Sequence, residues 1–165
     1  MHGWSGERIG LPVEIPDRWK RYMAECFPAL EEGVSFEFTS RVDFNYNCLS
    51  WALGCDTVPF WKDKGGLWIW PDIADDTVEG WIQVCELHGF CQVQDPNFVV
   101  GFEKIAILKN NDGELHACRS DRNGKWKSKL GVWGPDIDHD GLAGLEQSYG
   151  SVVKVLQKHR PDWLR

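Results

Sequence analysis

The residue of this sequence that is best placed to do chemistry is Cys48, which directly follows Asn47. Asn is a favoured N-cap, 49–53 is largely apolar and Gly54 is a typical stop, so the sequence predicts a short helix with Cys48 in its first turn. Unpaired backbone N–H groups and the positive end of the helix dipole favour a thiolate there. The same N–H groups would hold the oxyanion that forms when the thiolate attacks a carbonyl.

His116 is the predicted partner of Cys48. It lies in the middle of a predicted strand, which makes it the most rigidly held of the five histidines. A thiolate needs a base that shuttles its proton, and a strand-held imidazole supplies one. The pair predicts a cysteine-dependent amide hydrolase or acyl-transfer enzyme (a peptidase, amidase or deamidase) that acts on a protein or peptide-like substrate.

The second nitrogen of the His116 ring needs an acceptor, and the predicted acceptor is Asp138. With hairpin loops of even length, Ser128 points to the other sheet face, and His116 shares its face with Cys118, Lys125, Lys127, Lys129, Glu103, Ile105 and Ile107. Lysine cannot accept a hydrogen bond, so it does not compete for this role. Glu103, Asp136 and His139 stay open as alternatives to Asp138.

An aromatic segment over 56–72, which contains Trp68 and Trp70, predicts one wall of a substrate groove. Asn47, Trp51 and Lys129 are expected to contact substrate in the same groove. Trp61 belongs to the same segment.

The six cysteines contain no Cys-x-x-Cys spacing, so the sequence predicts neither a zinc site of standard spacing nor a cofactor. One metal grouping stays open on its spacing, which is not specific: Cys55 lies seven residues after Cys48, and Cys118 lies two residues after His116. Because no export signal is apparent, the thiols are expected to be reduced.

The elements that would position these residues predict an α+β fold, with N-terminal helices packed on a C-terminal antiparallel sheet. Hydrophobic periodicity and turn signals place helices at 17–30, 48–53, 76–87 and 141–149, a weak strand within 33–42, and strands at 90–94, 102–109, 114–119, 125–130 and 151–156. The length of 165 residues favours a single domain over 1–165, in which 1–15 is an N-terminal arm.

Composition narrows the classes of partner. The formal net charge of −7 argues against nucleic acid, and no apolar run is long enough for a membrane span or a signal peptide. A cytoplasmic location is expected unless a dedicated system exports the chain.

The ten Trp residues support an alternative function, a non-catalytic protein-binding module of the immunity or adaptor type that uses the Trp-rich loop. An effector or toxin would use the same thiol chemistry as the hydrolase.

Four sequence blocks carry a resemblance: Asn-Cys-Leu-Ser-Trp-Ala-Leu-Gly at 47–54, His-Ala-Cys-Arg at 116–119, Trp-Lys-Ser-Lys-Leu-Gly at 126–131 and Asp-Ile-Asp-His at 136–139. From about residue 45 to 156, the chain resembles an uncharacterised family of small bacterial domains, which implies no known activity. More distantly, the order of Cys and His resembles the papain-like superfamily, including the NlpC/P60 type of cell-wall peptidases. That resemblance implies a papain-like arrangement with Cys48 as nucleophile and His116 as base.

Overall fold

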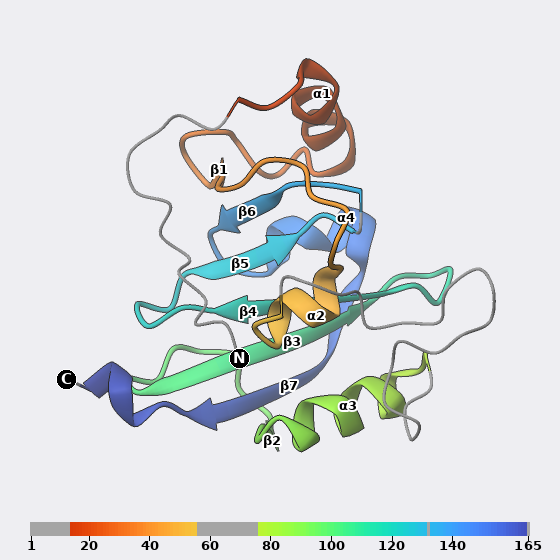
Figure 1. The fold of residues 1–165 in the computed structure, drawn as a ribbon. Coiled ribbons are helices and arrows are strands. Elements are labelled where there is room, and N and C mark those ends of the chain that lie inside the picture. The colour runs from red at the N-terminus through yellow and green to blue at the C-terminus, as the bar shows by residue number, and fades with distance from the viewer. Residues whose placement is uncertain (1–13, 56–75, 132, 165) are drawn as a thin grey trace.

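A computed structural model of the protein describes residues 14–55, 76–131 and 133–164. Its centre is a seven-stranded sheet in the order β1-β6-β5-β4-β3-β7-β2, in which all neighbouring strands are antiparallel (Figure 1). The strands are β1 (Phe36–Phe38), β2 (Cys91–Val93), β3 (Phe102–Lys109), β4 (Leu115–Ser120), β5 (Trp126–Lys129), β6 (Asp136–His139) and β7 (Ser151–His159).

Helices lie on both sides of this sheet. They are α1 (Asp17–Cys26), α2 (Cys48–Ala52), α3 (Val78–Leu87) and α4 (Glu146–Tyr149), with short 3-10 turns at Ala143–Leu145 and Pro161–Leu164. Within the described ranges, no helix is long and apolar enough to cross a membrane.

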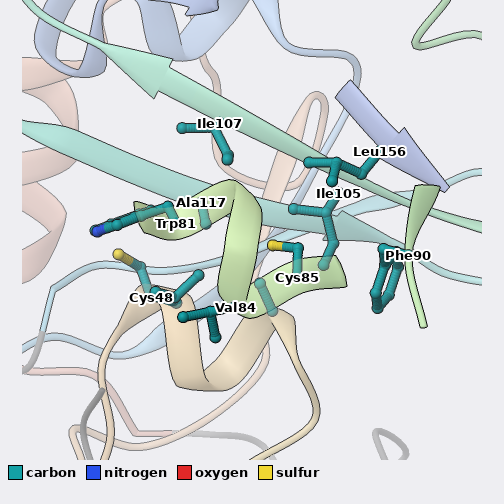
Figure 2. Close-up of a cluster of buried hydrophobic side chains, with 11 residues drawn as sticks. Cys48, Trp81, Val84, Cys85, Phe90, Ile105, Ile107, Ala117 and Leu156 are labelled. Atoms are coloured by element: carbon teal, nitrogen blue, oxygen red, sulfur yellow. The ribbon is translucent and has the colours of Figure 1, made fainter. Parts of the chain in front are cut away.

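The sheet separates two apolar clusters, which define its two faces. On the α2 face, the helices α2 and α3 pack on alternate strand residues that include Ile105, Ile107, Ala117 and Leu156 (Figure 2). On the α4 face, α1 and the segment before α4 pack on the strand residues that alternate with those of the α2 face. These include Ala106, Leu108, Cys118 and Ile137. Alternation along β3 and β4 therefore decides which helices each side chain meets.

Local sequence explains the helix boundaries. The side chain of Asn47 accepts a hydrogen bond from the backbone N–H of Ser50, and the hydroxyl oxygen of Ser50 accepts one from the backbone N–H of Asn47, a capping box that starts α2. Thr77 caps α3 with one hydrogen bond, which its hydroxyl oxygen accepts from the backbone N–H of Gly80. Helix α1 ends at Cys26 and not at residue 30, because Phe27 precedes Pro28 and a residue before proline avoids the helical region.

The predicted α+β class and the predicted strand at 102–109 are confirmed. The predicted order of helices first and sheet second is wrong. Strand β1 precedes α2 in the chain and pairs with β6, a strand that sequence periodicity had left unassigned. Helix α4 lies between β6 and β7. The arm at 1–15, apart from its last two residues, and the Trp-rich loop at 56–72 lie outside the described residues.

Candidate functional site

Cys48 occupies the position that the sequence predicted, the first turn of α2, but its side chain is buried. The side chain lies in the apolar cluster of the α2 face with Ala117 and Val84, and only 5% of its surface is exposed (Figure 2). Burial raises the pKa of the thiol to about 11, whereas hydrogen bonds from the backbone of Ala117 and Leu49 act in the opposite direction and are outweighed. Burial therefore favours the neutral thiol and does not support the predicted thiolate.

Iodoacetamide near neutral pH is expected to modify Cys48 at least about 100-fold more slowly in the native protein than in the urea-unfolded chain. A rise of the pKa from 9 to about 11 lowers the thiolate fraction by about two orders of magnitude, and burial blocks approach of the reagent. Mass spectrometry of the labelled peptides measures both rates. The exposed Cys91 is the matched control and should react at similar rates in both states. If Cys48 were labelled first in the native protein, an activated thiolate would be present after all.

His116 lies on the opposite face of the sheet from Cys48. Its cross-strand neighbour is Leu108, which belongs to the apolar cluster of the α4 face, whereas the next residue, Ala117, faces Cys48. The His116 ring stacks on Tyr149 of α4 with the ring centroids 3.7 Å apart. The structure therefore does not bring the predicted nucleophile and base together.

The set of residues that share a sheet face with His116 differs from the predicted set because of the two hairpin loops on either side of β4. Lys109 pairs with Leu115, and Ser120 pairs with Trp126, so each loop contains five residues and not an even number. One residue of difference moves every side chain of a strand to the other face relative to its partner. Ser128, which was predicted to point away from His116, is consequently its hydrogen-bonding partner.

A buried chain of hydrogen bonds runs from His116 through Ser128 to His139. The His116 Nε2 atom lies 3.1 Å from Ser128 Oγ, which lies 2.8 Å from His139 Nε2, and His139 Nδ1 lies 2.8 Å from the carbonyl oxygen of Gly141. A carbonyl only accepts, so His139 donates from Nδ1 and accepts from the Ser128 hydroxyl at Nε2. His116 then donates from Nε2 to Ser128, so every hydrogen bond of the chain is satisfied when both rings are neutral.

Burial, and to a smaller extent the nearby His139, lower the pKa of His116 to about 3; burial lowers the pKa of His139 to about 4. Both rings are thus neutral at physiological pH. Together with full burial of Ser128, this makes the chain an internal polar link between β4, β5 and β6. All three of its side chains are buried and none lies at the surface.

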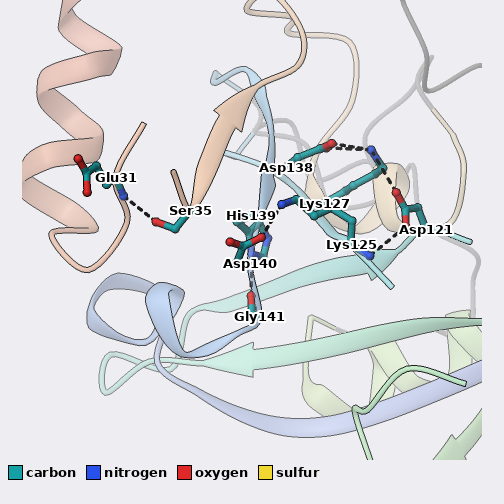
Figure 3. Close-up of polar contacts among 9 residues, drawn as sticks. All are labelled: Glu31, Ser35, Asp121, Lys125, Lys127, Asp138, His139, Asp140 and Gly141. Atoms are coloured by element: carbon teal, nitrogen blue, oxygen red, sulfur yellow. Dashed lines mark hydrogen bonds and ion pairs between the residues drawn. The ribbon is translucent and has the colours of Figure 1, made fainter. Parts of the chain in front are cut away.

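Asp138 does not orient His116. Its carboxylate accepts two hydrogen bonds from Lys127 Nζ, at 2.8 and 3.0 Å, and Asp121 lies 3.9 Å from the same ammonium (Figure 3). The pairing of Lys127 with Asp138 across β5 and β6 places both on the α2 face. The structure therefore does not place Asp138 beside His116, and its catalytic role stays a prediction without support from this geometry.

The three residues left open as alternatives to Asp138 have other partners. Glu103 pairs with Arg160 at 2.6 Å, and Asp136 accepts a hydrogen bond from the hydroxyl of Tyr46 at 3.0 Å. His139 is linked to His116 only through Ser128. Among the described residues, no group of three or more His, Cys, Asp or Glu side chains could hold a metal ion.

The predicted contact residues Asn47, Trp51 and Lys129 lie together on the α2 face. Asn47 is buried as the cap of α2. The guanidinium carbon of Arg119 lies over the Trp51 ring, 4.2 Å from the centroid of that ring. The ring of Tyr46 lies 5.5 Å from that of Trp51. These buried contacts anchor α2 to the sheet and leave little surface for a substrate. The predicted contacts Trp68 and Trp70 lie outside the described residues.

Lys129 is completely buried, and its ammonium joins two loops. Nζ donates to the carbonyl of Asp43 at 2.7 Å and to the carbonyl of Gly134, and it lies 4.7 Å from the centre of the Tyr46 ring. Burial lowers the pKa of Lys129, while the nearby Asp136 raises it. The lysine therefore acts as an internal clamp between the segment before α2 and the turn from β5 to β6.

The two clamped loops carry an exposed aromatic pair that sequence reasoning missed. Phe44 and Trp133 directly neighbour the two clamped carbonyls, their ring centroids lie 5.2 Å apart, and they are 55% and 63% exposed. Gly134 makes the turn possible, because a Cβ atom there would lie 2.2 Å from the backbone oxygen of Leu130. The available signal was a large aromatic residue inside a Gly- and Pro-rich turn, where no core is expected.

A family model described as a domain of unknown function (DUF7689) matches residues 37–157. The matched range includes α2, α3, nearly the whole sheet, Lys129 and both aromatic residues of the exposed pair. The match does not connect the chain to the papain-like superfamily. No curated protein and no solved structure matches the chain. The chain therefore belongs to the DUF7689 family.

Proposed function

We propose that this protein is a non-catalytic protein-recognition module whose contact anchor is the Phe44–Trp133 pair. The observation that carries the proposal is an exposed aromatic pair in which each ring comes from a different loop and both loops are held by one buried ammonium. Exposed Trp residues are enriched among the side chains that dominate protein interfaces.

Preorganisation supports this role. The Lys129 clamp and the close packing at Gly134 hold both loops before any partner arrives. Binding then loses little conformational freedom, so more of the contact energy is realised as affinity. A burial of both rings by a partner would also remove a large apolar surface from water.

The partner that we propose is a protein with a basic surface. The chain carries 25 Asp and Glu against 18 Lys and Arg, and this net charge of −7 attracts a cationic partner and repels an acidic one. An Arg or Lys side chain of the partner that lies over the face of Trp133 would add a cation–π contact.

The test of this function uses the tagged protein as bait in three forms: wild type, Trp133→Ala and Leu87→Ala. Leu87 on α3 is 60% exposed, so its truncation is a matched control for loss of exposed apolar surface. The expected partner is recovered by wild type and Leu87→Ala but at least about 10-fold less by Trp133→Ala. Calorimetry with that purified partner should show about 2 kcal/mol weaker binding for Trp133→Ala, and a similar loss for Phe44→Ala.

Recovery of the same proteins by all three baits would refute the aromatic anchor. Because Phe44 and Trp133 are exposed, their truncation is not expected to unfold the protein, and a circular dichroism melt checks this. Association that does not slow with added salt would refute the basic nature of the partner.

The cysteine hydrolase and its papain-like arrangement stay predictions that the positions of Cys48 and His116 do not support. The two hypotheses separate through Cys48→Ala. Under the proposed recognition function this variant keeps partner binding, whereas a hydrolase would lose its activity completely.

A further inference from the structure

A small cavity lies at the end of β5 that is opposite to the turn with Trp133. Its volume is about 160 Å³, and its walls include Phe98, Lys104, Ser120 and Trp126. Lys104, Ser120 and Trp126 come from three neighbouring strands, and the other wall is the loop that follows β2. The cavity is therefore built on the rigid sheet and is separate from the aromatic pair.

Lys104 is a buried cation that lacks an anion. Only 3% of its surface is exposed, and its Nζ donates one hydrogen bond, to the carbonyl of Asp95 at 2.5 Å. An ammonium group has three donors. Within the described part of the chain, no carboxylate pairs with Lys104, whereas the buried Lys127 on β5 has Asp138. A buried charge is normally paired, so a negative ligand is the missing element.

Ser120 supplies a second donor. Its hydroxyl oxygen accepts from the backbone N–H of Lys104 at 2.8 Å, which leaves the hydroxyl proton able to donate into the cavity. Asp95, which holds the Lys104 ammonium, directly precedes the cavity wall at Pro96. An ammonium and a hydroxyl at one wall suit the two oxygens of a single carboxylate.

The remaining walls are mixed: Phe98 and Trp126 are aromatic, and Pro96, Asn97, Gly124 and Gly141 complete the lining. Phe98 lies against the turn at Gly124, where a Cβ atom would be only 2.8 Å from the ring, so glycine is needed for this packing. Trp126 forms the wall on β5. A cavity of about this volume accommodates a ligand the size of benzene. We infer that the cavity binds a small monocarboxylate with a flat apolar body, either as a free molecule or as the C-terminal carboxylate of a peptide.

The experiment titrates benzoate into the ¹⁵N-labelled protein and follows backbone amide signals. Saturable shifts are expected at Gly124 and Gly141, which line the cavity, with a dissociation constant on the order of millimolar. Neutral benzamide should bind at least about 10-fold more weakly. No saturable shift with benzoate, or equal binding of benzamide, would overturn the inference without any variant.

Variants identify the groups that bind. Lys104→Met keeps the length of the side chain and should weaken benzoate binding at least about 10-fold, whereas Lys109→Met, at the exposed end of the same strand, should not. Ser120→Ala is a smaller change that should weaken binding a few-fold, which covers the case in which Lys104→Met does not fold. Unchanged benzoate binding in a folded Lys104→Met variant would overturn the site.

The source of the carboxylate is decided by a second titration. A tripeptide with a C-terminal Phe and a free carboxylate is compared with its amide. If the free peptide binds more tightly than benzoate and its amide does not bind, the ligand is a chain terminus; if only benzoate binds, it is a free small molecule. Trp133→Ala should leave either result unchanged, so this inference and the recognition function fail independently.

Discussion

Replacing Lys129 with alanine is expected to lower the free energy of unfolding by about 3–5 kcal/mol, because it removes one partner of a buried charge network. The ammonium is completely buried, and it satisfies the carbonyls of Asp43 and Gly134. Its loss leaves both carbonyls without this donor, and it also removes the largest favourable charge interaction of the buried Asp136. Urea denaturation followed by tryptophan fluorescence measures the change.

A double-mutant cycle separates the charge from the packing. Lys129→Met keeps the buried stem, and Asp136→Asn removes the carboxylate whose charge Lys129 offsets. If the ammonium matters through Asp136, the double variant should be less destabilised than the sum of the two single variants. The exposed Lys109→Met is the control and should stay within about 0.5 kcal/mol of wild type. A change below about 1 kcal/mol in Lys129→Ala would show that the clamp does not hold the two loops.

The free energy of unfolding is expected to fall as the pH is lowered from about 6.5 to about 4, through the buried pair His116 and His139. Unfolded histidines bind protons below a pKa of about 6.5. Burial lowers the native pKa of His116 to about 3 and that of His139 to about 4. The unfolded state therefore binds more protons in this window, and each ring contributes a slope of up to about 1.4 kcal/mol per pH unit.

Asp136 contributes in the opposite direction. Burial raises its native pKa to about 6, so between about pH 6 and 4 the native state binds a proton that the unfolded state does not. This carboxyl offsets the slope of about one histidine in the wild type. The wild-type slope alone therefore does not report the histidines. A comparison of wild type with histidine variants does, because the contribution of Asp136 is present in every one of these proteins.

His139→Asn should reduce the slope of unfolding free energy against pH by about 1.4 kcal/mol per pH unit between pH 4.5 and 6. The control His159→Asn removes an exposed histidine ring that lies outside the His116–Ser128–His139 chain, so it tests whether the change is specific to that chain. Chemical denaturation at several pH values measures the slopes. An equal slope in wild type and His139→Asn would mean that the His116–Ser128–His139 chain does not stay neutral.

The sequence predicted those features of the fold that depend only on residues close together in the chain, such as the start of α2 and the bounds of β3. Asn47 and Ser50 form the capping box of α2, so Cys48 lies in the first helical turn as expected. The strand at 102–109 has the predicted bounds, because a long apolar run flanked by turn signals leaves few alternatives. The same reasoning missed the strand at 136–139, since its short alternating pattern becomes a strand only by pairing with β1 and β5.

The candidate catalytic pair shows where sequence reasoning stopped. Spacing alone could not tell a five-residue hairpin loop from an even one, and that single residue decides whether His116 shares a face with Ser128 or with Lys129. Position in a first helical turn favoured a thiolate at Cys48, but burial on the α2 face raises its pKa further than the helix end lowers it.

Helix caps, strand lengths and the acidic charge follow from the amino acids and their near neighbours, because the forces involved act within a few residues or sum over the chain. The face on which each side chain lies, the burial of Lys129 and Lys104, and the meeting of Phe44 with Trp133 depend on contacts between residues that are far apart in the chain. Those contacts are made by strand pairing and loop clamping, and the same side chains in another register would form a different surface.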